Sequence, residues 1–214
     1  MTELYKADIS QRQMKESCRR FYFCLPGNER EKADRFIREE DRLRFIAGRL
    51  MIRTLASEKL GTDAPEILLT EYGKPYIPAA DGFHFNISHS GDLVVLAVSD
   101  APVGVDIEQE VPTEWIELSK TFAAKEREIL KKADDPLKCF YRIWTVCEAF
   151  SKAVGKGLSL FDEEMPDIDL SHGTVDYRGM TLFFDCRERD GYHLSVCGST
   201  MNLSTEAKCF LTKI

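Results

Sequence analysis

The stretch Val103–Glu108 (Val-Gly-Val-Asp-Ile-Glu) constrains the fold more than any other part of the chain, because its apolar and polar positions alternate. Side chains of a strand alternate between two faces, so Val103, Val105 and Ile107 share one face. The other face carries Asp106 and Glu108, about 6–7 Å apart at Cα. We expect the apolar face to be buried and the carboxylates to stand on the open face. Neighbouring carboxylates repel each other, so the pattern indicates either a bound Mg²⁺ or the solvated end of an edge strand.

Composition indicates an ordinary globular protein. The 214 residues suffice for one large domain or two small ones, and 43% of them are hydrophobic and 30% charged. Apolar runs such as Leu93 to Val98 are too short to span a bilayer, and residues 1–20 lack the apolar core of a signal peptide. Seven cysteines without paired spacing argue against a disulfide framework and a zinc site. We therefore expect a cytoplasmic protein with free thiols and no membrane partner.

The net charge of −7 argues against general nucleic-acid binding, which usually requires a basic surface. One segment departs from this acidic balance, since residues 42 to 53 hold four arginines and no acid. They are Arg42, Arg44, Arg49 and Arg53. This segment is either a local anion site or a helix whose acidic partners lie elsewhere in the fold.

In the first half of the chain, hydrophobic spacing predicts one helix over residues 30–59, ended by the Gly61–Pro65 stretch. On this helix Arg42, Arg49 and Arg53 share a face. A strand-like segment, the turn at 72–75, and a strand over 83–87 that runs into a loop at 88–91 follow. A buried strand is expected over 93–98, before Pro102 and the acidic strand.

In the second half, helices are expected over 122–132 and 140–154, separated near Asp134-Asp135-Pro136. The second has an apolar stripe that includes Cys147, while Glu148 and Lys152 lie on a neighbouring face. Strands are expected over 182–186 and 192–197, joined at Asp190-Gly191, with another over 207–211. Helices mixed with antiparallel strands in each half indicate an α+β fold, although no sequence repeat is visible.

Glu148 and Lys152 are four residues apart, so both point to one side of their helix. A solvated ion pair explains such a spacing, and it contributes only a few tenths of a kcal/mol. The functional alternative makes Glu148 a third oxygen ligand of the metal or a general base, with Lys152 neutralising a phosphate.

Several further residues could bind an anion. The Ser88-His89-Ser90-Gly91 segment offers hydroxyl and backbone N–H groups, and Lys74 lies on a turn stiffened by Pro75. The chain has no nucleotide-binding glycine loop and no serine nucleophile elbow. Carboxylates for a metal together with scattered cations suit phosphoryl transfer.

Four segments, in order, resemble the Sfp-type (surfactin-synthetase-activating) 4′-phosphopantetheinyl transferases. They are Glu71–Pro75, Phe85–Gly91, Val103–Glu108, and Trp144–Lys152 with Gly155–Ser159. The resemblance covers most of residues 20–160 and fades in the tail. It implies two similar α+β halves related by a pseudo-twofold axis, which we place at residues 1–101 (the coenzyme A side) and 102–214 (the metal and carrier-docking side).

The resemblance also implies an activity. Members of this family are holo-[carrier protein] synthases, which move the 4′-phosphopantetheine arm of coenzyme A to a serine of an apo acyl or peptidyl carrier protein and release adenosine 3′,5′-bisphosphate. The carrier could serve fatty acid, polyketide or nonribosomal peptide synthesis. Because one chain contains both halves, we expect a monomer.

Site residues follow by motif. The resemblance implies that Asp106, Glu108 and Glu148 hold Mg²⁺, that Glu148 serves or orients the base, and that Lys152 balances charge on the transferred phosphate. It further implies that the coenzyme A phosphates are bound by Lys74, Ser88 and His89, and the nucleotide 3′-phosphate by Lys32 and Arg44. Helical spacing instead groups Arg42, Arg49 and Arg53.

One position departs from the family pattern. The family usually has a lysine immediately before the helical glutamate, and this chain has Cys147. This difference keeps open a non-catalytic protein that binds coenzyme A or a carrier. The carboxylates alone also leave open a Mg²⁺-dependent phosphohydrolase or nuclease.

Overall fold

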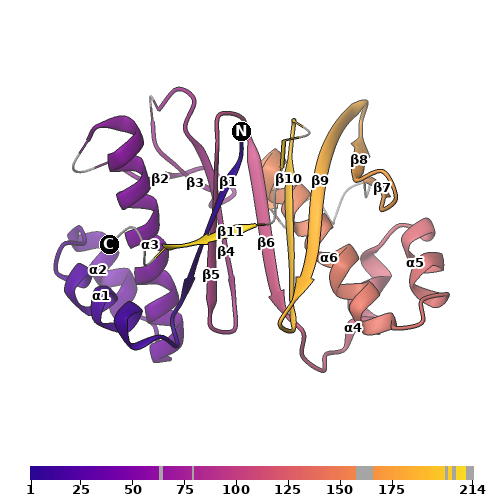
Figure 1. Cartoon of the computed structure of the whole chain (residues 1–214), viewed down its shortest axis with the longest axis horizontal. Coiled ribbons are helices and arrows are strands. Elements are labelled where there is room, and N and C mark those ends of the chain that lie inside the picture. The colour runs from indigo at the N-terminus through magenta and orange to yellow at the C-terminus, as the bar shows by residue number, and fades with distance from the viewer. Residues whose placement is uncertain (63–64, 79, 158–165, 201, 204–205, 211–214) are drawn as a thin grey trace.

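The computed structural model describes residues 1–62, 65–78, 80–157, 166–200, 202–203 and 206–210. Two β-sheets stand next to each other, with a long helix packed on each (Figure 1). Leu158 and Ser159 of the family-like segments, the Asp63-Ala64 part of the helix stop, and Leu211 of the last predicted strand lie outside the described residues. Within the described part of the chain, every helix is too short or too polar to cross a membrane.

The first sheet has four strands, and three helices accompany it. The strand order is β11 (Ala207–Cys209), β1 (Glu3–Asp8), β5 (Leu93–Ser99) and β4 (His84–Ser90). The helices are α1 (Arg12–Tyr22), α2 (Gly27–Asp34) and α3 (Glu39–Leu60). A small hairpin, β2 (Leu68–Leu69) with β3 (Pro75–Tyr76), follows α3.

The second sheet has five strands, and its main helix is α6 (Pro136–Val154). The strand order is β6 (Val103–Gln109), β10 (Tyr192–Gly198), β9 (Met180–Arg189), β8 (Thr174–Tyr177) and β7 (Asp167–Asp169). Between β6 and α6 lie α4 (Trp115–Leu118), the 3-10 helix η1 (Ser119–Thr121) and α5 (Ala124–Lys131).

The two sheets repeat one topology. In the first, β1 pairs with the later strand β5, which pairs with the preceding strand β4, and α3 lies between β1 and β4 in the chain. In the second, β6, β10, β9 and α6 have the same relations. The predicted α+β fold with two similar halves is therefore confirmed. The proposed division after residue 101 stays a prediction, and β11 from the second half pairs with β1 of the first.

Three apolar clusters fill the fold. One lies between the first sheet and its helices, and a second lies between the second sheet and α6. The third joins the two sheets, and it contains the apolar face of β6 (Val103, Val105, Ile107) with Val95 of β5 and Val196 of β10. The predicted separation of the two β6 faces is thus confirmed.

At the β4–β6 seam, side chains replace a backbone ladder. The described strands β4 and β6 belong to different sheets, yet three β4 side chains accept the backbone N–H groups of β6. Asn86 Oδ1 accepts from Val105 at 2.8 Å, Ser88 Oγ from Ile107 at 3.4 Å, and Ser90 Oγ from Gln109 at 3.0 Å. Alternate side chains of β4 therefore accept hydrogen bonds from alternate backbone N–H groups of β6.

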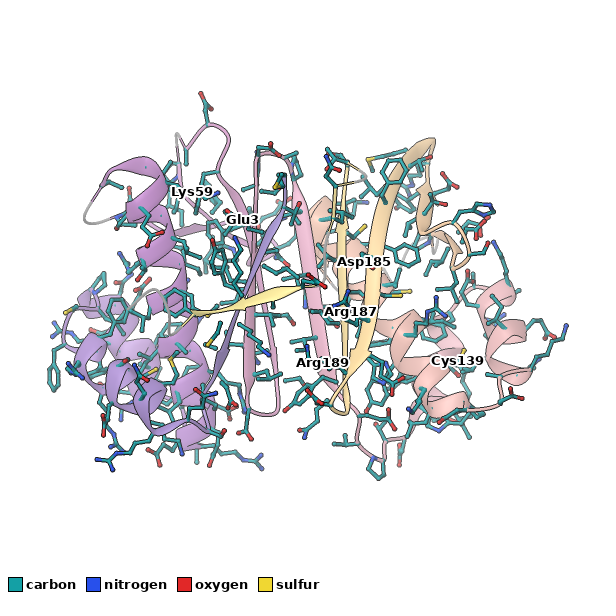
Figure 2. All side chains as sticks on the ribbon, viewed as in Figure 1. Glu3, Lys59, Cys139, Asp185, Arg187 and Arg189 are labelled. Atoms are coloured by element: carbon teal, nitrogen blue, oxygen red, sulfur yellow. The ribbon has the colours of Figure 1, made fainter. Side chains whose placement is uncertain are left out.

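Glu3 ties three elements of the first half together. Its carboxylate on β1 lies 3.0 Å from the ammonium of Lys59 on α3 and 2.6 Å from that of Lys208 on β11 (Figure 2). Hydrogen bonds from Lys208 and then Lys59 lower the pKa of Glu3 to about 2. This pairing helps to hold the C-terminal strand on the first sheet.

Two sequence predictions for the fold are wrong, and some elements were not predicted. The single helix over 30–59 is wrong, because residues 35–38 separate α2 from α3. The loop over 88–91 is wrong in part, since β4 continues to Ser90 and its serines bond to β6. The pattern also gave no strand for β1 and no helix for α1. The hairpin at Asp190-Gly191 is confirmed, and both residues have the positive φ of a tight turn.

The arginines of α3 have acidic partners. Arg49 and Arg53 lie 3.2 and 3.0 Å from the two carboxylate oxygens of Glu29, and Arg42 lies 2.9 Å from Asp34. Glu29 and Asp34 belong to α2, so these ion pairs fasten α2 to α3. Of the two interpretations of this basic segment, the helix with distant acidic partners is the one observed for these three arginines.

Gly104 sets how closely α6 approaches β6. A Cβ atom at Gly104 would lie 1.9 Å from the carbonyl oxygen of Ala149 and 2.4 Å from the backbone nitrogen of Ala153. Both contacts involve the backbone of α6, which cannot move aside as a side chain could. Only glycine at this position lets the helix lie directly on the strand.

We expect Gly104→Ala to lower the free energy of unfolding by more than about 3 kcal/mol, because the helix must separate from the strand. Denaturant titration measures this change. Gly27→Ala is the matched control, since no atom lies within 4 Å of a Cβ there, and it should change stability by no more than about 1 kcal/mol. Equal stability of the two variants would contradict the close approach.

Candidate functional site

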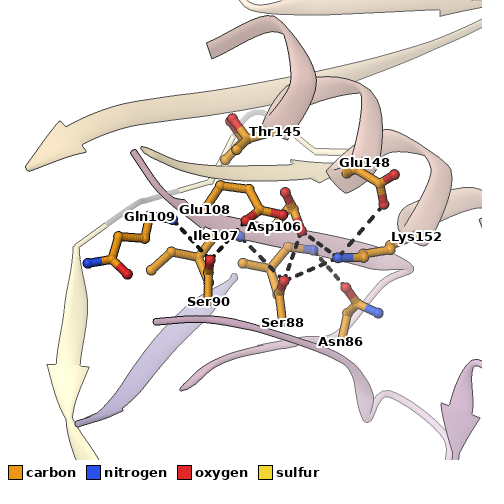
Figure 3. Close-up of polar contacts among 12 residues, drawn as sticks. Asn86, Ser88, Ser90, Asp106, Ile107, Glu108, Gln109, Thr145, Glu148 and Lys152 are labelled. Carbon is orange, nitrogen blue, oxygen red and sulfur yellow. Dashed lines mark hydrogen bonds and ion pairs between the residues drawn. The ribbon is translucent and has the colours of Figure 1, made fainter. Parts of the chain in front are cut away.

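Asp106 and Glu108 of β6 face α6, where Glu148 and Lys152 lie one helical turn apart (Figure 3). The expectation of an open carboxylate face is wrong for Asp106, whose exposed fraction is 2%. Glu148 is also buried, at 9%. The close contact between β6 and α6 at Gly104 explains this burial, because the helix covers the polar face of the strand.

Two serines of the seam orient the two strand carboxylates. Ser88 Oγ–H donates to Asp106 Oδ1 at 2.8 Å, and Ser90 Oγ–H donates to Glu108 Oε2 at 2.9 Å. Each hydroxyl oxygen also accepts a hydrogen bond from a β6 backbone N–H, while its single proton is directed at the carboxylate. The seam therefore fixes the carboxylates as well as the strands.

The ammonium of Lys152 lies among these groups. It is 2.5 Å from Asp106 Oδ1, 3.2 Å from Ser88 Oγ and 4.0 Å from Glu148 Oε2 (Figure 3). Its nearest acidic partner is thus the buried strand residue rather than the residue four positions before it. The simple interpretation of Glu148 and Lys152 as a solvated surface pair does not describe this arrangement.

Two carboxylate oxygens in the site have no hydrogen-bond partner among the residues that the structure describes. They are the buried Asp106 Oδ2 and Glu148 Oε1. An unpaired buried oxygen anion is costly, and a hard cation satisfies it well. Within the described part of the chain, no three acidic, histidine or cysteine side chains already surround one point, and the Lys152 ammonium supplies the local positive charge.

Burial changes the acidity of the site. Removal from water raises the pKa of Glu148 to about 7, opposed by the charge of Lys152 and reinforced by Asp106 and Glu108. Burial and then the charge of Asp106 also raise the pKa of Glu108. Glu148 therefore changes its protonation state near neutral pH, as a general base requires.

A cleft of about 480 Å³ lies between the two halves beside Glu148 and Lys152. One wall comes from the 72–75 turn and from Asn86 and Ile87 of β4. The other wall comes from Glu148, Lys152 and residues 155–157. The site carboxyl and ammonium groups thus line a space that is large enough for part of a small-molecule substrate.

Lys74 lines the same cleft, but its ammonium contacts backbone carbonyls. The nearest is the carbonyl oxygen of Lys152 at 2.6 Å, followed by those of Val103 and Ala153, each at 3.4 Å. Burial lowers the pKa of Lys74 to about 8. A role for Lys74 in binding a phosphate stays a prediction.

His89 lies on β4 between Ser88 and Ser90, on the opposite face of the strand from these serines. Arg44 donates to the carbonyl of Gly91 at 2.5 Å and to Asp41 at 2.5 Å. Desolvation and then the charge of Arg44 lower the pKa of His89. Lys32 is exposed on α2, with its ammonium 5.4 Å from the centre of the Phe45 ring.

The structure thus brings together Ser88, Asp106, Glu108, Glu148 and Lys152 at one point. His89 lies outside this group, and the charge of Arg44 acts on it. Sequence reasoning gave Ser90 no role of its own, although it is two residues from Ser88. The period-2 pattern of β4 was the signal that could have identified it. Asn86, two residues before Ser88 on the same face of β4, is part of the same ladder.

Comparison with protein families finds two matches that adjoin each other. Residues 12–101 match a family described as 4′-phosphopantetheinyl transferase, N-terminal. Residues 102–197 match the 4′-phosphopantetheinyl transferase superfamily.

Curated relatives carry similar names. A 4′-phosphopantetheinyl transferase of Bacillus subtilis is 41% identical over 145 residues, 66% of this chain and 65% of the relative. The 4′-phosphopantetheinyl transferase Sfp of Bacillus subtilis (strain 168) is 38% identical over 150 residues, 68% of this chain and 66% of the relative. The human L-aminoadipate-semialdehyde dehydrogenase-phosphopantetheinyl transferase is 35% identical over 77% of this chain and 60% of its own length. The chain therefore covers slightly less than two thirds of each relative.

We expect the raised pKa of Glu148 to make stability fall as pH rises. Between about pH 4.5, the ordinary value, and about pH 7, the folded state binds more protons than the unfolded state. The contribution of Glu148 to the free energy of unfolding is fully present below that window and lost above it. The change is on the order of 3 kcal/mol. Glu148→Gln should remove this slope, as measured by denaturant titration at pH 5 and pH 8 with EDTA present. An unchanged slope would contradict the raised pKa.

Proposed function

The chain belongs to the 4′-phosphopantetheinyl transferase superfamily, and from this premise we propose that it transfers the 4′-phosphopantetheine arm of coenzyme A to a serine of an apo acyl or peptidyl carrier protein. The serine oxygen bonds to the phosphorus that bears the pantetheine arm. The bond from that phosphorus to the bridging diphosphate oxygen breaks, and adenosine 3′,5′-bisphosphate leaves. The chain is then a holo-[carrier protein] synthase. The observation that carries the proposal is the buried group of Asp106, Lys152 and Glu148 beside the cleft.

Glu148 is the proposed general base for the carrier serine. Its pKa of about 7 leaves a substantial fraction ionised at neutral pH while keeping the carboxylate basic enough to accept a proton. Its Oε1 has no hydrogen-bond partner among the residues that the structure describes, whereas Oε2 faces Lys152. Where Oε1 holds Mg²⁺, Glu148 would orient the base instead of accepting the proton itself. Burial, which raises the pKa, thus supports the role.

Lys152 is the proposed counter-charge for the transferred phosphate. Its ammonium already lies at the cleft wall, held by Asp106 and Ser88. A cation that is positioned before substrate binds needs little reorganisation when negative charge develops at phosphorus.

The donor set fits Mg²⁺. Asp106, Glu108 and Glu148 would hold the ion. The observation that supports this assignment is that a buried oxygen of Asp106 and one of Glu148 have no partner in the described part of the chain. When bound, Mg²⁺ supplies positive charge that offsets the diphosphate of coenzyme A. Ser88 and Ser90 keep two of the three carboxylates aimed at the site.

Coenzyme A is proposed to occupy the cleft between the halves, with its phosphates toward the basic residues of the first half. Ser88, His89 and Arg44 are the proposed phosphate contacts, and Lys32 is a further candidate. Arg42, Arg49 and Arg53 are less suitable, because their charges already pair with Asp34 and Glu29.

Cys147 is compatible with this function. Its side chain is fully buried in the apolar cluster under α6, and burial raises the pKa of its thiol, so it packs as a small apolar group. Where the family usually carries a lysine, this chain therefore has a side chain that packs in the core. Lys152 is a nearby cation. Because the usual lysine is absent, a second candidate function is a protein that binds coenzyme A or a carrier without transfer.

We further propose a cytoplasmic monomer. The seven cysteines lack the paired spacing of a disulfide framework, as is usual in a reducing compartment. The residues that line both walls of the cleft come from one chain.

Intact-mass analysis of an apo carrier protein incubated with this protein, coenzyme A and Mg²⁺ tests the function. We expect the carrier to gain one phosphopantetheine mass, and we expect the gain to be lost with EDTA. Asp106→Asn and Glu148→Gln should reduce the rate by at least about 100-fold, since Asp106 is a proposed Mg²⁺ ligand that also holds Lys152 and Glu148 is the proposed base.

Glu31→Gln is the matched control, because it removes the same charge from an exposed position of α2 and should leave the rate unchanged. Bound coenzyme A without transfer, across acyl and peptidyl carriers, would favour the binding protein. Cleavage of coenzyme A in the absence of carrier would favour the phosphohydrolase.

A further inference from the structure

Lys74 connects the two halves at the floor of the cleft. It belongs to the turn between β2 and β3, and its ammonium reaches the carbonyl oxygens of Val103, at the start of β6, and of Lys152 and Ala153, in the last turn of α6. An ammonium has three N–H donors, and three carbonyl oxygens lie within 3.4 Å of it. Its donors are thus engaged with the second half of the protein.

The end of α6 needs such a partner. The last four backbone carbonyls of a helix have no N–H partner inside the helix. In α6, the carbonyl of Ser151 accepts from the backbone N–H groups of Gly155 at 2.9 Å and Lys156 at 3.2 Å. The next two carbonyls, of Lys152 and Ala153, are those that accept from Lys74. A cation at this position also complements the negative end of the helix dipole.

The turn that carries Lys74 is itself held in place. The backbone N–H of Thr70 donates to the carbonyl of Lys74 at 2.9 Å, the N–H of Lys74 donates to Thr70 Oγ1 at 3.1 Å, and the N–H of Gly73 donates to the Thr70 carbonyl at 2.9 Å. Pro75 follows immediately and restricts the backbone further. The lysine therefore extends from a fixed base, which lowers the entropic cost of holding its ammonium at one point.

Resting on the proposed function, we propose that Lys74 is a positioning residue: it fixes the last turn of α6 and thereby places the Lys152 ammonium beside Asp106. Lys152 is held twice in this arrangement, at its carbonyl by Lys74 and at its side chain by Asp106. The proposal replaces the expectation that Lys74 binds a phosphate of coenzyme A. The depressed pKa of Lys74, caused by burial, agrees with an ammonium surrounded by protein.

Lys74→Met tests the proposal, because methionine keeps most of the apolar stem and removes the donors. Three measurements are made on the full chain: amide hydrogen exchange over residues 148–157, the dissociation constant for coenzyme A, and the kcat for carrier modification. We expect exchange in the last turn of α6 to accelerate by about tenfold or more. We expect kcat to fall by about tenfold or more, while the dissociation constant for coenzyme A changes by less than about threefold.

Two further variants separate positioning from a general structural effect. Lys74→Arg can still donate to the same carbonyls and should restore slow exchange and part of kcat. Lys15→Met removes the same charge from α1, which does not line the cleft, and should match the parent protein in all three measurements.

A large loss of coenzyme A affinity with unchanged exchange and kcat would overturn the proposal in favour of a phosphate ligand. Unchanged exchange at the end of α6 would overturn it by itself. If the parent chain transfers nothing, the proposed function fails, while the exchange and affinity measurements still decide whether Lys74 fixes α6.

Discussion

The hydrogen bonds between three β4 side chains and the backbone of β6 determine how the two halves meet. A backbone ladder would have fused the halves into one continuous sheet. The ladder of Asn86, Ser88 and Ser90 instead places hydroxyl groups between the strands, and these hydroxyls direct their protons at Asp106 and Glu108. The contact that joins the halves is therefore also the contact that orients the carboxylates.

Close packing of α6 on β6 is the second requirement for the site. Gly104 allows the helix backbone to touch the strand, and this contact brings Glu148 and Lys152 over the polar face of β6. Water is thereby removed from the carboxylates, which raises the pKa of Glu148. The glycine, two residues before Asp106, thus acts on the chemistry through distance and burial rather than through any group of its own.

Local sequence patterns predicted the elements that carry the site but not its long-range contacts. Period-2 spacing correctly assigned the faces of β6, and helical spacing correctly grouped Glu148 with Lys152. Burial of Asp106 could not be derived, because it depends on a helix more than 25 residues later in the chain. The break between α2 and α3 has no glycine or proline, so no local signal marked it. The contacts of Lys74 with the second half could not be predicted, since its partners lie 29, 78 and 79 positions away.

The side-chain seam also limits what else can pair with these strands. The exposed edge of a β-strand invites another chain to add to it, which can lead to aggregation. On β6, the N–H groups of Val105, Ile107 and Gln109 point toward β4 and are already satisfied within the molecule. On its other side β6 pairs with β10 along its full length. Two sheets can thus adjoin while both sides of β6 are occupied by contacts within the molecule.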